Sequence, residues 1–318
     1  MSGTTDRRAG IDLGARTLRA VVAEDGSIVG RASRPTPRGP TGAAITEAVI
    51  ETLDAALDNG GFAVDSLDAI GVASIGPLDR EVGVVVDPPT LPRSVSGIRL
   101  REPLEEHAGV PVQVDDDATA GLIGERAETE SPPSNMVFLY LSTGISAGIA
   151  VDGRVLRGWG DNAGAVGHVV VDPESDLQCS CGRPGHWDAF ASGSGIPDFA
   201  RSVAEEFDGD TDIPLSSTDL GAEDVFSLAG TDVLADMVIH RLARVNAVRV
   251  ATITATVAPE VVSIGGQLAL ENPTLVIAPI RDRVPSLLTT RVPEIRQSRL
   301  GGDAVLYGAL AIARRDGE

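Results

Sequence analysis

The stretch AGIDLGARTLRAVVAEDGSIVGRAS, residues 9–33, decides the fold class. Its apolar residues group around two turn signals, and this pattern predicts three strands, at Gly10–Gly14, Arg16–Ala23 and Ile28–Arg31. The sequence Glu-Asp-Gly-Ser between the second and third strands is typical of a hairpin turn. The chain is therefore expected to open with a β-meander.

A second opening of the same kind follows in NMVFLYLSTGISAGIAVDGRVLRG, residues 135–158. It again predicts a strand, a glycine-containing turn, a strand and a hairpin. Each opening is followed by stretches with helical spacing, such as residues 41–61, which end in Gly-Gly. The Pro and Ser residues of segment 130–135 are typical of a linker between the two parts. We therefore expect a duplicated α/β core.

The charge of the chain is strongly negative. Its 318 residues include 46 acidic and 26 basic side chains, a net charge of −20, and every basic residue is Arg. This composition indicates a protein adapted to a high-salt cytoplasm, where salt screens self-repulsion. The alternative is an ordinary acidic protein from a GC-rich genome, in which Arg replaces Lys. In either case the surface should repel nucleic acid and anionic membranes. Adaptation to high salt further predicts a melting temperature that rises with KCl concentration.

The chain contains no apolar run long enough to span a membrane, and residues 1–14 have no apolar signal-peptide core. We therefore expect a cytoplasmic location. The two cysteines, Cys179 and Cys181, are too close in sequence to form a comfortable disulfide bridge.

Three glycine-containing turns suggest phosphate binding. They are IDLGART at residues 11–17, LSTGISAG at 141–148 and SIGGQ at 263–267. Glycine allows backbone N–H groups to approach phosphate oxygens, and Asp12 has the chemistry to hold Mg²⁺ or its waters. A single turn of this kind is more simply a hairpin turn between two strands, whereas the three together favour a nucleotide site.

The segment VDDDATAGLIGE, residues 114–125, places carboxylates between a predicted buried strand and a helix. Asp117 is well placed there to accept the proton of an attacking hydroxyl group. The alternative is that Asp116 or Asp117 only caps the helix.

The segment CSCGRPGHWDAF, residues 179–190, holds both cysteines together with His186. With His168 upstream, Cys179, Cys181 and His186 supply four ligands for a closed, structural zinc site. The alternative is two free thiols and two unrelated histidines.

Taken together, these motifs resemble the ROK family of sugar kinases, within the actin, hexokinase and heat-shock-protein superfamily, over nearly the whole chain. The resemblance implies an α/β, two-lobed, actin-like ATPase (ribonuclease H-like) fold with an interlobe cleft. The small lobe would contain residues 1–125 and 302–318, and the large lobe, with the zinc loop, residues 126–301. It also implies a homodimer. The net charge of −20, rather than the resemblance, argues against binding to nucleic acid or to an anionic membrane.

The resemblance further implies ATP-dependent phosphorylation of a hexose at its 6-hydroxyl, most simply glucose, with Mg²⁺ and a structural Zn²⁺. Asp117 would be the general base. The substrate residues would be Gly76, Thr90, Asp116, Asp117, His168 and Asp188. The nucleotide residues would be Asp12, Gly14, Thr17, Thr143, Gly144, Gly265 and Gly266. The zinc ligands would be His168, Cys179, Cys181 and His186.

The chain departs from the family pattern at several of these positions. Ala165 replaces a Glu that binds sugar hydroxyls, Asp188 replaces Glu, Asp116 and Thr90 each replace Asn, and Arg16 replaces Thr. These departures keep two alternatives open. One is a kinase for another sugar, such as an N-acetylated amino sugar or fructose. The other is a non-catalytic, sugar-sensing member of the family.

Overall fold

The computed structural model describes residues 6–92 and 94–314, and the contacts within the chain divide it into two compact units. Unit 1 comprises residues 1–132, 155–163 and 303–318, and unit 2 comprises residues 133–154 and 164–302. The first boundary lies inside the predicted linker. The segments 126–132 and 155–163, which we assigned to the large lobe, pack with unit 1. The lobe boundaries stay a prediction.

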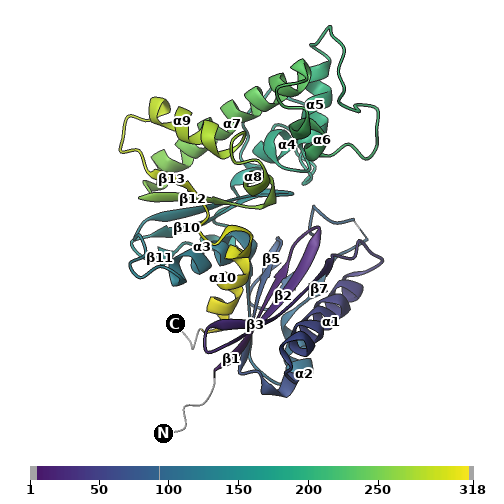
Figure 1. Ribbon diagram of the computed structural model, residues 1–318, viewed down its shortest axis with the longest axis vertical. Coiled ribbons are helices and arrows are strands. Elements are labelled where there is room, and N and C mark those ends of the chain that lie inside the picture. The colour runs from purple at the N-terminus through teal and green to yellow at the C-terminus, as the bar shows by residue number, and fades with distance from the viewer. Residues whose placement is uncertain (1–5, 93, 315–318) are drawn as a thin grey trace. The chain divides into compact units, whose positions relative to one another are not determined.

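Unit 1 is built on a five-stranded sheet of order β3-β2-β1-β4-β8 (Figure 1). The strands β1, β2 and β3 pair antiparallel, as the meander predicted, and β1, β4 and β8 pair parallel. A small sheet of β5, β6 and β7 was not foreseen. The elements are β1 (Arg7–Leu13), β2 (Thr17–Glu24), β3 (Ser27–Pro35), α1 (Gly42–Gly60), η1 (Val64–Ser66), β4 (Ala69–Ser74), β5 (Leu78–Asp79), β6 (Val84–Val85), β7 (Ile98–Arg99), α2 (Arg101–Ala108), β8 (Val112–Asp116), α3 (Asp117–Ala127), η2 (Trp159–Asp161) and α10 (Ala304–Ala313).

Alternate side chains of the meander serve two separate cores. Val22 packs in the apolar cluster formed with α1, whereas its neighbour Val21 packs with α10. This alternation follows from the period of two in a strand, and it places α1 and α10 on opposite faces of the sheet (Figure 1). The helix α10 approaches so closely that a Cβ atom added at Gly71 would lie 1.8 Å from the carbonyl oxygen of Ala309.

Unit 2 repeats this topology with a sheet of order β11-β10-β9-β12-β13. The strands β9 and β10 pair antiparallel, and β9, β12 and β13 pair parallel. The expected duplicated core is confirmed at this level. The elements are β9 (Met136–Leu141), β10 (Ile145–Val151), β11 (Arg154–Val155), η3 (Val166–His168), α4 (Trp187–Ala191), α5 (Ile196–Ala204), α6 (Ala222–Ser227), α7 (Val233–Val257), β12 (Val261–Gly265), α8 (Gln267–Glu271), α9 (Ile277–Leu287), β13 (Glu294–Gln297) and η4 (Gly301–Asp303).

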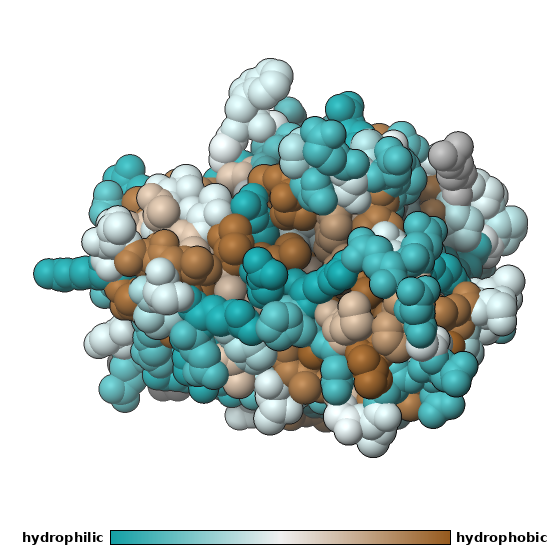
Figure 2. Space-filling model, turned by 90° about the horizontal axis from the view of Figure 1, so that it is seen from above, coloured by the Kyte–Doolittle hydropathy of each residue, from teal (hydrophilic) through white to brown (hydrophobic). Residues whose placement is uncertain are grey.

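Within the described residues, no helix has both the length and the apolar character needed to cross a membrane. Figure 2 shows one face of the molecule, on which hydrophilic residues surround smaller groups of hydrophobic ones.

Candidate functional site

Asp117 lies at the junction of a buried strand and a helix, as the sequence analysis predicted. The strand β8 ends at Asp116, and α3 begins at Asp117. The Asp116 carboxylate accepts a hydrogen bond of 2.9 Å from the backbone N–H of Thr119 and so caps the helix. Asp116 is therefore the cap of α3, and its predicted contact with the sugar stays a prediction. Asp117 occupies the first turn of the helix, where the helix dipole stabilises negative charge, and this location suits an acid–base group.

The carboxyl group of Asp116 is held in an environment that disfavours its charge. Burial, and then the neighbouring charge of Asp115, raise the pKa of Asp116 from 3.8 to about 6. The folded protein therefore retains this proton at pH values where the unfolded chain has lost it. As the pH rises from about 4 to about 6, the contribution of Asp116 to the free energy of unfolding falls, and it stays low at higher pH.

We expect Asp116→Asn to stabilise the protein at pH 8 by about 2 kcal/mol, with a smaller gain at pH 5. The amide keeps the helix cap, because Asn caps helices as well as Asp does, and it removes the buried charge. Urea unfolding in molar KCl at both pH values measures the difference. Asp58→Asn, at an exposed position of α1, is the matched control. An equal gain at both pH values for Asp116→Asn would contradict the expectation.

Asp115, the residue before Asp116, is the centre of a buried ion-pair network that was not predicted from the sequence. The carboxylate of Asp115 accepts a hydrogen bond of 2.8 Å from Nη1 of Arg157, and Nε of Arg80 lies 3.4 Å from the same oxygen. The side chain of Asp115 is only 1% exposed. The sequence carried one signal, because an acidic residue inside a predicted buried strand needs a partner. Nothing local identified the two arginines.

The first glycine-containing turn joins β1 to β2 in unit 1. Gly14 is required there, since an added Cβ atom would lie 2.8 Å from the carbonyl oxygen of Thr17. Asp12 is buried on β1, where its Oδ2 accepts hydrogen bonds of 3.0 and 2.6 Å from Arg19. Its Oδ1 is also buried and has no hydrogen-bond partner among the described residues. One carboxylate oxygen is therefore neutralised by Arg19, and the other fits a metal-bound water.

The second and third turns come together in unit 2. Thr143 and Gly144 connect β9 to β10. Gly265 is the last residue of β12, which pairs with β9, and Gly266 follows it. Gly266 has a φ of +90°, and an added Cβ atom there would lie 2.2 Å from the carbonyl oxygen of Leu141. The sheet therefore places the two glycine-containing segments side by side, as a nucleotide site requires.

The four predicted zinc ligands converge in unit 2. The ligand atoms of His168, Cys179, Cys181 and His186 all lie within 4.8 Å of one another. Sγ of Cys179 is 3.5 Å from Nδ1 of His168, and Sγ of Cys181 is 3.3 Å from Nδ1 of His186. Tetrahedral zinc bonds of ordinary length place a sulfur and a nitrogen ligand about 3.6 Å apart. The donor set and its spacing therefore fit zinc.

The pKa shifts of Cys179 and His186 are also compatible with a bound cation. Desolvation by burial raises the pKa of the Cys179 thiol to about 12, so it ionises at neutral pH only beside a strong positive charge. Desolvation lowers the pKa of His186 below its usual value and favours the neutral imidazole, which is the form that binds metals.

Asp188 is held by the backbone of the second turn. It lies in α4 and is buried, and its Oδ1 accepts a hydrogen bond of 2.7 Å from the backbone N–H of Ile145. Its Oδ2 lies 4.0 Å from Sγ of Cys179. Burial raises the pKa of Asp188 to about 6, although the Ile145 N–H opposes that shift. Asp188 thus links the cysteine loop to the turn that carries Gly144, with one oxygen already engaged.

Two further predicted substrate residues lie in unit 1. The hydroxyl oxygen of Thr90 is buried and has no hydrogen-bond partner among the described residues, so it suits a ligand hydroxyl. Gly76 is exposed, and an added Cβ atom would meet only the backbone nitrogen of Leu78, at 3.7 Å.

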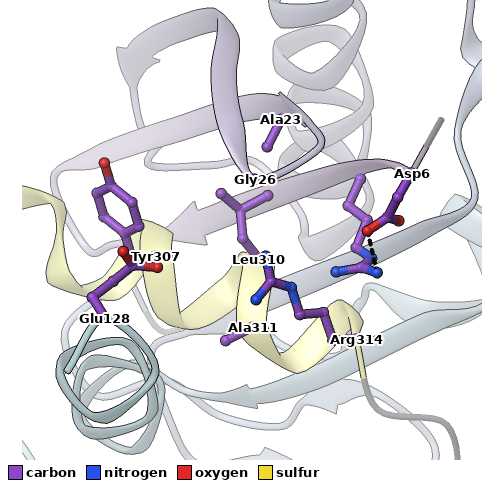
Figure 3. A pocket seen from close by; sticks show the side chains of 9 residues that line it. Asp6, Ala23, Gly26, Glu128, Tyr307, Leu310, Ala311 and Arg314 are labelled. Atoms are coloured by element: carbon purple, nitrogen blue, oxygen red, sulfur yellow. Dashed lines mark ion pairs between the residues drawn. The ribbon is translucent and has the colours of Figure 1, made fainter. Parts of the chain in front are cut away.

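A small pocket elsewhere in unit 1 includes none of the predicted site residues. It lies beside α10 (Figure 3), and its volume of about 20 Å³ suits one water molecule. It is lined by Asp6, Arg8, Ala23, Gly26, Glu128, Tyr307, Leu310, Ala311 and Arg314.

Comparison with known proteins identifies the family. Residues 8–316 match the ROK family, and the chain belongs to that family. A glucokinase of Pyrobaculum calidifontis is 36% identical over 97% of this chain and 95% of its own length. An N-acetylmannosamine kinase of Escherichia fergusonii is 33% identical over 82% of each chain.

A solved structure agrees with this assignment. The crystal structure of a ROK family glucokinase from Streptomyces griseus, in complex with glucose and AMPPNP, superimposes with a TM-score of 0.80. It is 26% identical and covers 97% of this chain and 99% of its own. The α/β, actin-like fold expected from the sequence is therefore confirmed.

Proposed function

We propose that this protein is an ATP-dependent glucokinase that phosphorylates the 6-hydroxyl of glucose, with Asp117 as the general base. The observation that carries the proposal is the position of Asp117, which directly follows β8 and lies in the first turn of α3. The 36% identity to a glucokinase over nearly the whole chain supports the choice of reaction and sugar.

In the proposed reaction, the oxygen of the sugar 6-hydroxyl attacks the γ-phosphorus of ATP while Asp117 accepts the proton of that hydroxyl. The bond from that phosphorus to the β,γ-bridging oxygen breaks, and ADP leaves. Thr17 and Gly14, with Thr143 and Gly144, would hold the phosphates through backbone and hydroxyl groups. Asp12, through its Oδ1, would hold a water of Mg²⁺, which supplies positive charge to the transferred group.

The zinc site would have a structural role. We propose that His168, Cys179, Cys181 and His186 bind one Zn²⁺, whose role is to fix the loop by closed tetrahedral coordination. Asp188 follows His186 by two residues and contacts both Cys179 and the Ile145 amide. A fixed loop therefore gives His168 and Asp188 defined positions for binding sugar hydroxyls.

Ala165→Glu should strengthen sugar binding. Ala165 is exposed, so a longer side chain fits without clashing with the core, and it restores the carboxylate typical of the family. A charge-assisted hydrogen bond contributes about 1.5–3 kcal/mol, so the KM for glucose should fall about tenfold or more. Initial rates over a glucose series measure this. Ala43→Glu, at an exposed position of α1, is the matched control, and an unchanged KM in Ala165→Glu would contradict the assignment.

Ala165 also favours one alternative substrate class. The small side chain leaves room for a bulky substituent on the sugar, and an N-acetylmannosamine kinase is among the relatives. A coupled ADP-release assay with a panel of sugars separates the two possibilities. The proposal requires the highest kcat/KM for glucose, and a much higher value for N-acetylmannosamine would replace it.

We further propose that the enzyme works as a homodimer in a salt-rich cytoplasm. The net charge of −20 supports the salt requirement. Sedimentation and melting curves over a KCl series test both statements.

A further inference from the structure

The segment 155–163 follows an unusual path. The residues on both sides of it belong to unit 2, whereas the segment itself packs with unit 1. Four residues, 164–167, separate the end of this segment from the proposed zinc ligand His168. Whatever fastens this segment to unit 1 therefore also fixes the starting point of the chain that leads to His168.

Charged side chains fasten the segment at two points. Near its start, Arg157 donates to the buried carboxylate of Asp115 at 2.8 Å. Near its end, Asp161 accepts a hydrogen bond of 3.1 Å from Arg80, which also lies 3.4 Å from Asp115. The backbone closes the loop between them, since the N–H of Ala163 donates to the carbonyl of Arg157 at 2.9 Å. The two arginines and two aspartates sum to zero charge.

The attachment point on unit 1 is close to the proposed chemistry. Asp115 precedes Asp116 and Asp117 on the same strand end, and its Oδ1 also accepts a hydrogen bond of 3.1 Å from the N–H of Asp116. Arg157 thus binds an oxygen that itself orients the backbone leading into Asp117.

The energetics favour a positional role over a stabilising one. Two ions withdrawn from water gain little net stability over well-packed apolar side chains. Here Oδ2 of Asp115 and Nη2 of Arg157 are buried without a hydrogen-bond partner among the described residues. An ion pair with unsatisfied hydrogen-bonding atoms stabilises the fold little. The direction and length of its one hydrogen bond nevertheless define a single position for the segment.

We propose that Arg157 is a positioning residue for the sugar site, and that its ion pair with Asp115 fixes the segment leading to His168 onto β8, the strand that leads directly into Asp117. The inference rests on the proposed function. It assigns no direct role to the nucleotide turns.

The test compares wild type, Arg157→Ala, Arg157→Lys and Arg34→Ala. Arg34 pairs with Glu51 at an exposed site in unit 1 and is the matched control. Steady-state kinetics give kcat and separate KM values for glucose and ATP. In Arg157→Ala, the KM for glucose should rise at least about tenfold, while the KM for ATP stays within about twofold. Arg157→Lys should recover part of the glucose KM, because it keeps the positive charge but places it on a more flexible side chain that lacks the planar guanidinium group.

The possible outcomes are distinct. A loss of folded protein alone lowers the apparent kcat and leaves both KM values unchanged, so that result would overturn the positioning role. An equal rise in both KM values, or an Arg34→Ala variant that behaves like Arg157→Ala, would also overturn it. If the wild type shows no sugar-dependent ADP release, the proposed function fails, and the positioning role fails with it. Hydrogen exchange that stays unchanged at residues 157–163 in Arg157→Ala would overturn the anchoring itself.

Discussion

Asp117→Asn should reduce sugar-dependent turnover by about 10³-fold or more, because a positioned general base contributes about 10²–10⁴-fold to rate. Asn has nearly the same shape as Asp but accepts no proton at neutral pH. The KM for glucose should change little, since the amide still accepts or donates one hydrogen bond to the sugar hydroxyl. The measurement is kcat and KM from ADP release with Mg·ATP and glucose in molar KCl.

The control for this variant is another Asp→Asn change on the same unit. Asp58→Asn lies at an exposed position of α1 and should keep wild-type rates. Circular dichroism and zinc content should match the wild type in both variants. If folded Asp117→Asn retains more than about a tenth of the wild-type kcat, Asp117 is not the base.

Cys181→Ser should abolish zinc binding and reduce kcat/KM about a hundredfold or more. Cys181 is the exposed thiol of the cluster, so the change disturbs packing little and removes one zinc ligand. The loop that carries His168 and Asp188 then loses its fixed position, and displacement of substrate-positioning groups by about 1 Å can cost about 10²-fold in rate. Metal analysis should find about one zinc ion per wild-type chain and almost none in the variant.

Two further variants sharpen the zinc prediction. His186→Cys should keep zinc, because thiolate and imidazole are both good zinc ligands. His240→Ala, at an exposed position of α7 outside the cluster, should keep both zinc and activity. If wild-type protein purified without chelators contains no zinc, then the short sulfur–nitrogen distances reflect S–H···N hydrogen bonds, and the zinc assignment is wrong.

The sequence predicted those parts of the fold that have a strong local signal. The first meander, the helix of residues 42–60 and the strand-to-helix junction at Asp117 each combine periodicity with turn or cap residues. The third strand extends beyond its predicted end to Pro35. The prediction stopped short because the outer residues of the strand are exposed and lack an apolar pattern. The strands β5, β6 and β7 contain two residues each, which is too short for any alternation to be recognised.

In the candidate site, too, only the features with a strong local sequence signal could be predicted. The cluster of two Cys and two His side chains could be predicted, because both residue types are rare in this chain and have few other roles in such spacing. The contact of Asp188 with the Ile145 amide joins residues 43 positions apart, and the pair of Arg157 and Asp115 joins residues 42 positions apart. Such contacts depend on which strands become neighbours, and no local pattern encodes that.

The most direct test of the central claim is to identify the product. Wild-type, zinc-loaded protein is incubated with Mg·ATP and glucose in molar KCl, and the sugar phosphate is identified by ³¹P NMR and by a glucose-6-phosphate dehydrogenase assay. The account predicts glucose 6-phosphate in equal amount to the ADP formed, with ATP hydrolysis at most a small fraction of that rate when sugar is absent. Folded, zinc-loaded protein that forms no glucose 6-phosphate would contradict it.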